Sequence, residues 1–142
     1  MIDVEEITAA ARASVSHLRH LVATIPRRSH DIAVDDVLTL INDFFETFAR
    51  LRAEEGRIGS SLRLTPMWRA HLAEGDDLHH TLLRELPWWQ RSALDYHPRE
   101  YIDCWRRLSP HVSIFLETCE ALYGIVDRLV VHQQSNERAV SA

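Results

Sequence analysis

A hydrophobic repeat at helical spacing, which runs through three long stretches, constrains this chain more than any other feature. In the first stretch, apolar residues recur every three or four positions from Val4 to Ile25, and the pattern ends at Pro26. In the second, they recur from Val34 to Leu51, and Gly56 closes the stretch. This spacing places the apolar side chains on one face of an α-helix, so both stretches predict long amphipathic helices.

The third stretch lies near the end of the chain and runs from Val112 to Val130. Ser109 is suited to the N-cap of this helix and Pro110 to its first position. Long stripes that repeat about every 3.5 residues favour nearly parallel or antiparallel packing. The predicted fold class is therefore all-α, a helical bundle of three long amphipathic helices.

The segment between the second and the last long helix contains most of the helix-breaking residues. Glycine and proline punctuate it at Pro66, Gly75, Pro87 and Pro98. We therefore expect a loop and then several short helices, inserted between the second and the last long helix. The expected loop covers residues 56–64, and the short helices cover 66–74, 76–86, 87–96 and 98–108.

Length and composition favour one globular domain. The chain has 142 residues, of which 46% are hydrophobic, which is enough to bury a core. We expect a single bundle domain over 1–134 and a disordered tail over 135–142. All 16 basic residues are arginine, which indicates a GC-rich, bacterial coding sequence. The start of the chain lacks the pattern of a signal peptide, and no apolar run reaches the length of a membrane span, so we expect a cytoplasmic protein without membrane contact.

The charge distribution disfavours nucleic acid as a partner. The net charge is -5, and residues 31–56 hold seven acidic residues against two arginines. Arg27 and Arg28 lie at one end of the second helix, whereas Arg57 and Arg63 lie at the other. Because that helix rises 1.5 Å per residue, the two pairs are roughly 35 Å apart and form no single basic patch.

Five aromatic residues of the middle segment are candidates for binding: Trp68, Trp88, Trp89, Tyr101 and Trp105. Tryptophan and tyrosine combine a large contact area with a polar group, which suits interfaces and ligand pockets. The alternative is that these bulky side chains fill the irregular space between short helices.

The stretch "HLAEGDDLHH" offers His71, His79 and His80 as weak candidates for metal ligands. The chain has no Glu-x-x-His pair of the kind used by dimetal bundles, and no two histidines are four residues apart. We therefore predict no metal and no cofactor.

The spacing of some arginines and histidines is similar to the signature of small helical ribonucleases of the HEPN type, an arginine followed four to six residues later by a histidine. Matches occur at Arg12 with His17, Arg91 with His97 and Arg106 with His111. This composition produces about three such matches by chance, so no family is assigned. Arg106 and His111 remain weak candidates for catalytic residues.

The leading functional hypothesis is a non-enzymatic helical interaction protein, such as an adaptor, a regulator or an accessory subunit. It would use helix faces and the aromatic middle segment to bind a protein partner or a second copy of itself. One alternative is a small helical hydrolase or ribonuclease, for which Arg106 and His111 must converge with His71, His79 or His80. Another is a ligand-binding sensor domain with an apolar cavity beside Trp68 or Trp105.

Overall fold

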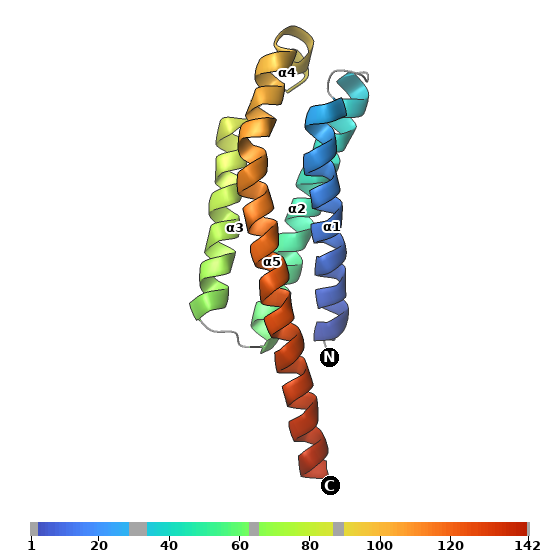
Figure 1. The fold of residues 1–142 in the computed structure, drawn as a ribbon, viewed down its shortest axis with the longest axis vertical. Helices are drawn as coiled ribbons and strands as arrows, with labels where there is room; N and C mark the ends of the chain where they lie inside the picture. The colour runs from blue at the N-terminus through green and yellow to red at the C-terminus, as the bar shows by residue number, and fades with distance from the viewer. Residues whose placement is uncertain (1–2, 29–33, 63–65, 87–89, 142) are drawn as a thin grey trace.

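The computed structural model describes residues 3–28, 34–62, 66–86 and 90–141, and this part of the chain is all-α and contains no strand. The helices alternate in direction along one long axis, and the last continues beyond the ends of the others (Figure 1). Their bounds are α1 (Val4–Arg28), α2 (Val34–Leu62), α3 (Pro66–Glu85), α4 (Gln90–Tyr96) and α5 (Pro98–Ser141).

The bundle has four long helices rather than three. Helix α1 packs against α2 and α5, and α3 packs against the same two helices. Helix α4 is short and lies against α2 and α5. The prediction of an all-α bundle is confirmed, whereas the prediction of several short inserted helices is corrected to one long helix, α3, and one short helix, α4.

The apolar repeat of the first stretch forms the inner face of α1. Its buried residues include Ala11, Val15, Leu18 and Ile25, all with no exposed surface. The carboxylate of Asp3 caps the helix, because its Oδ1 accepts hydrogen bonds from the backbone N–H groups of residues 5 and 6. Proline at position 26 does not end the helix, which continues to Arg28.

Helix α2 continues past Gly56, where the sequence predicted its end, and stops at Leu62. The predicted loop over 56–64 is therefore wrong for residues 56–62, while residues 63 and 64 lie outside the described part of the chain. Ile58 is fully buried, and its burial continues the inner stripe of the helix by two more turns. Packing of this stripe outweighs the cost of about 1 kcal/mol for a glycine inside a helix.

Helix α3 passes through Gly75 without a break, so the predicted pair of helices over 66–74 and 76–86 is one helix. Its buried residues recur every three or four positions, which is the repeat of a long bundle helix, but two of them are histidine and glycine. These residues are Trp68, His71, Gly75, Leu78 and Leu82. Because a histidine and a glycine do not count as apolar in a sequence pattern, the stripe escapes notice.

Helix α5 joins the predicted short helix over 98–108 to the predicted long helix, and Pro110 lies inside it. The Ser109 hydroxyl donates to the carbonyl of Trp105, four residues earlier, instead of capping a helix start. Trp105, Leu108 and Val112 are all buried, so the two inner stripes are in phase across the proline. Continuous packing on both sides holds the helix together despite the missing N–H group.

Residues 135–141 belong to the last turns of α5, where the sequence predicted a disordered tail. The division into a domain over 1–134 and a tail stays a prediction. Within the described residues, no helix is long and apolar enough to cross a membrane.

Candidate functional site

The most unusual feature of the core is a cluster of polar side chains between three helices. Glu55 of α2, His71 of α3 and two residues of α5, Cys119 and Tyr123, meet there and are almost fully buried. His71 Nε2 lies 2.7 Å from Glu55 Oε2, and the Tyr123 hydroxyl donates to the same carboxylate oxygen at 2.8 Å. Cys119 Sγ is 3.6 Å from His71 Nε2.

A tryptophan contact holds helices α2 and α3 together beside the cluster. The indole N–H of Trp68 donates to the backbone carbonyl of Glu55 at 3.1 Å. The indole reaches this carbonyl because Gly59 has no side chain, and a Cβ there would lie 2.4 Å from Trp68 Nε1. Glycine at this position therefore allows the close approach that places His71 opposite Glu55.

The geometry of the cluster differs from that of a catalytic triad. In a triad the histidine uses one ring nitrogen for the nucleophile and the other for the acid that orients it. Here the same atom, Nε2, faces both Glu55 and Cys119, while Nδ1 of His71 is buried without a hydrogen-bond partner among the described residues. Burial also raises the pKa of the Cys119 thiol and the pKa of the Tyr123 hydroxyl, which favours their neutral forms.

The arrangement instead brings three different ligand atoms to one point. The nitrogen of His71, the sulfur of Cys119 and a carboxylate oxygen of Glu55 lie within 4.8 Å of one another. A cavity of about 220 Å³ reaches Glu55 from the side of α2 and α3, and its lining includes Leu72 and Gly75. An ion pair between Arg52 and Asp76, both also in the lining, crosses between the same two helices.

Of the three histidines that the sequence suggested as metal ligands, the structure places His71 alone in this cluster. His79 lies 3.2 Å from Arg52, and burial lowers its pKa, so its neutral form is favoured. The exposed His80 donates to the backbone carbonyl of Asp76. The sequence pattern does not indicate Glu55 and Cys119 as partners of His71, because they lie 16 and 48 residues away from it in the chain.

The aromatic residues that the sequence suggested for binding lie mostly inside the bundle. Trp68, Tyr101 and Trp105 are 3%, 1% and 0% exposed, so they offer no surface to a partner. Trp88 and Trp89 lie outside the described residues. These three bulky side chains fill the space between helices, which was the alternative to a role in binding.

The residues suggested for catalysis do not converge. Arg106 is exposed and lies 3.8 Å from Asp103 on the same helix. His111 is exposed on a groove of about 250 Å³ between α3 and α5, which also includes Glu74 and Asp77. His71 lies inside the core, His79 beside Arg52 and His80 against the carbonyl of Asp76. Within the described residues, no hydrogen bond joins any of the three to Arg106 or His111.

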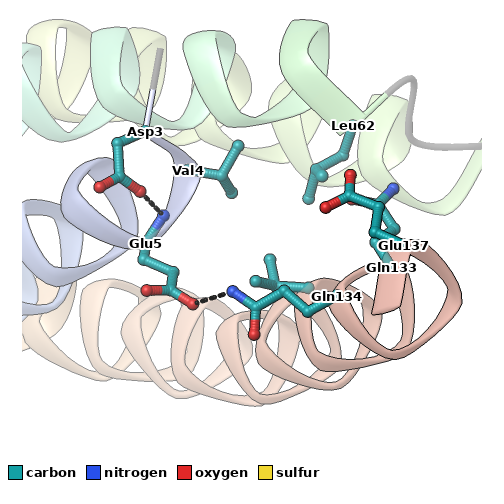
Figure 2. Close-up of a pocket in the computed structure, with 8 residues that line it drawn as sticks. Asp3, Val4, Glu5, Leu62, Gln133, Gln134 and Glu137 are labelled. Carbon is teal, nitrogen blue, oxygen red and sulfur yellow. Dashed lines mark hydrogen bonds between the residues drawn. The ribbon is translucent and has the colours of Figure 1, made fainter. Parts of the chain in front are cut away.

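A larger groove lies at the end of the bundle where α5 passes the first residues of α1 and the last turn of α2 (Figure 2). Its volume is about 480 Å³. Three apolar side chains, Val4, Leu62 and Val130, line it, one from each helix. We call it the terminal groove; its polar lining residues are Asp3, Glu5, Gln133, Gln134 and Glu137.

The charged lining residues of the terminal groove are all acidic. Glu5 accepts a hydrogen bond from the side-chain amide of Gln134 at 3.0 Å, and Asp3 accepts from the backbone N–H of Glu5 (Figure 2). Both donors are neutral, so these contacts among the described residues leave the negative charges of Asp3 and Glu5 uncompensated.

Comparison with known proteins yields no matching family model, no matching curated protein and no matching solved structure.

Proposed function

We propose that this protein is a non-enzymatic helical interaction protein, an adaptor, regulator or accessory subunit, that binds a basic amphipathic helix of a partner protein in the terminal groove. The observation that carries the proposal is the groove itself, with an apolar floor of Val4, Leu62 and Val130 inside an acidic rim. An apolar stripe flanked by arginine or lysine matches such a groove in both hydrophobicity and charge.

The end of helix α5 supports this choice of site. Between residues 127 and 139, Val130 is half-buried and the other side chains are exposed. Val131 and Leu129 are 60% and 37% exposed, although both are apolar. Because the burial of exposed apolar side chains is favourable in water, a partner along this segment would stabilise it.

The spacing of the groove residues on α5 suits a helical partner. The groove residues of α5 follow one another at steps of three, one and three positions, so they share one face of the helix. They are Val130, Gln133, Gln134 and Glu137. A second helix lying along this face meets an apolar residue, two amides and a carboxylate in turn. Amide side chains both donate and accept hydrogen bonds, so they tolerate a polar rim on the partner.

The experiment measures binding of a labelled model peptide to the full chain by fluorescence anisotropy. The peptide is a helix with leucine every three or four residues and arginine on both flanks of the stripe. We expect a dissociation constant on the order of micromolar. Val130→Asp places a charge on the apolar floor and is expected to weaken binding by at least ~10-fold, which corresponds to ~1.4 kcal/mol.

Two controls test the two halves of the proposal separately. Glu117→Arg changes the charge of an exposed residue of α5 that is not in the groove, and binding is expected to change by less than ~2-fold. A peptide with the same leucines but glutamate flanks is expected to bind more weakly. Equal binding of both peptides would overturn the proposal. Equal binding by Val130→Asp and the unmodified chain, with an unchanged circular dichroism spectrum, would overturn it as well. So would a dimer, detected by light scattering, whose interface covers the groove.

A further inference from the structure

The buried cluster between α2, α3 and α5 has no role in the interaction proposed above, and its chemistry is that of a metal site. We infer that Glu55, His71 and Cys119 bind one zinc ion inside the bundle. The inference depends on three ligand atoms of different chemistry that converge within 4.8 Å of one another. It is independent of the proposed function, because none of the three residues lines the terminal groove.

One distance within the cluster fits tetrahedral zinc, and a second requires a small adjustment. Zinc binds cysteine sulfur at about 2.3 Å and histidine nitrogen at about 2.0 Å, so the two ligand atoms of a tetrahedral site lie about 3.5 Å apart. Cys119 Sγ and His71 Nε2 are 3.6 Å apart. Glu55 Oε2 and His71 Nε2 are 2.7 Å apart, the length of a hydrogen bond. An ion between these two atoms separates them by about 0.6 Å more, a small side-chain movement.

The types of ligand select the metal. A set of sulfur, nitrogen and carboxylate oxygen suits zinc, whereas magnesium and calcium require oxygen ligands. Binding of the ion at Nε2 moves the proton between Glu55 and His71 to Nδ1 of the His71 ring, and it releases the thiol proton of Cys119 to solvent. The fourth position of the ion is left for a water molecule or for the second oxygen of Glu55.

The surroundings supply two things that such a site needs beyond its ligands, an oriented carboxylate and a route for the ion. Tyr123 donates to the carboxylate of Glu55 at 2.8 Å and so fixes its orientation. The cavity of about 220 Å³ includes Glu55 in its lining and provides a route for the ion. Gly75 lines the same cavity, and its lack of a side chain keeps this route wide.

Zinc at this position would link three helices. Glu55 belongs to α2, His71 to α3 and Cys119 to α5, so a single ion attaches α3 to both of the helices on which it packs. The ion is therefore expected to stabilise the folded chain in the manner of a structural zinc site.

The test is a titration of the full chain, freed of metal with a chelator and kept reduced, with Co²⁺ as a spectroscopic substitute for zinc. We expect a single ion per chain, a thiolate-to-cobalt charge-transfer band in the near ultraviolet, and the strong visible bands of tetrahedral cobalt. Zinc is expected to displace the cobalt and to raise the melting temperature. Cys119→Ser should remove the charge-transfer band. His71→Gln should weaken metal binding by more than ~100-fold, which is more than the loss of an outer-shell partner costs.

Matched variants use the other cysteine of α5 and a neighbouring histidine of α3. Cys104→Ser and His80→Gln are expected to bind cobalt like the unmodified chain, since Cys104 and His80 lie outside the cluster. The titration of the unmodified chain decides the question even where Cys119→Ser fails to fold. A folded chain that shows no charge-transfer band with Co²⁺, or a band that disappears equally in Cys104→Ser, would refute the zinc site.

Discussion

The two sides of this bundle are built from different chemistry. On the side of α1, the core is mainly hydrocarbon, with Leu18, Leu21 and Ile25 packed between α2 and α5, although the hydroxyl of Ser14 donates to the buried carboxylate of Glu54 at 2.9 Å. On the side of α3, the core holds the Glu55 and His71 pair, with a cavity beside it. Apolar contacts are non-directional, whereas buried polar groups must each find a partner with suitable geometry. We therefore expect apolar packing on the α1 side to contribute more to stability than the polar contacts on the α3 side.

Polar contacts on the α1 side lie mainly at its rim. Arg19 pairs with Glu120 at 2.9 Å, and both side chains are more than a third exposed. Exposed pairs of this kind contribute at most about 1 kcal/mol. The difference between the two sides thus lies in what is buried, and single substitutions can break or sharpen it.

The largest effect is expected from the hydrocarbon side. Leu18→Ala removes a fully buried side chain, and the cavity it leaves is expected to lower the free energy of unfolding by about 3 kcal/mol. Urea denaturation followed by circular dichroism measures this change. Leu83→Ala is the control, because Leu83 is 58% exposed and its loss should change stability by less than ~0.5 kcal/mol. Equal losses in the two variants would contradict the assignment of stability to the α1 side.

A smaller effect is expected from the polar side, measured in the presence of a chelator. Tyr123→Phe removes the hydroxyl that donates to Glu55, so a buried carboxylate oxygen loses a donor. We expect a loss of about 2 kcal/mol in the free energy of unfolding. Tyr101→Phe is the matched control, because the Tyr101 hydroxyl is buried without a hydrogen-bond partner among the residues described. Its removal should leave the free energy of unfolding at neutral pH unchanged or slightly higher. A comparable loss of stability in both variants would contradict a stabilising contribution of the hydrogen bond from Tyr123 to Glu55.

The smallest effect appears only at alkaline pH. Burial raises the pKa of Tyr101 from 10.0 to about 12, so between these values the unfolded chain loses this proton while the folded chain keeps it. The stability from Tyr101 is complete below pH 10 and declines as the pH rises towards 12. At pH 11 the expected loss in the free energy of unfolding is ~1.4 kcal/mol, and Tyr101→Phe should not show this loss.

Denaturation at pH 8 and pH 11 measures this difference. Leu83→Ala serves as the control, since Leu83 is 58% exposed and carries no titratable group, so the pH dependence should stay as it is in the unmodified chain. An identical loss between the two pH values in the unmodified chain and in Tyr101→Phe would contradict the contribution of Tyr101.

The sequence by itself determined the helical class and the hydrocarbon side of the core. The repeats of α1 and α2 are visible because their buried residues are apolar, and residues such as Leu18 and Ile41 needed no knowledge of their neighbours to be recognised as core. The repeat of α3 was hidden because its inner face includes His71 and Gly75. Breaks predicted at Gly56, Gly75 and Pro110 failed because local preferences of about 1 to 3 kcal/mol are weaker than the packing of a continuous stripe.

Tertiary structure alone decided the polar cluster and the terminal groove. In the sequence, His71 lies 16 residues from Glu55 and 48 residues from Cys119. The three side chains meet only because they lie at the same height along three neighbouring helices of the bundle. The groove likewise needs the start of α1, the end of α2 and the last third of α5. A repeat along one helix shows which face is buried, but it does not show which residues of other helices lie opposite, since that depends on where each helix begins and how far it continues.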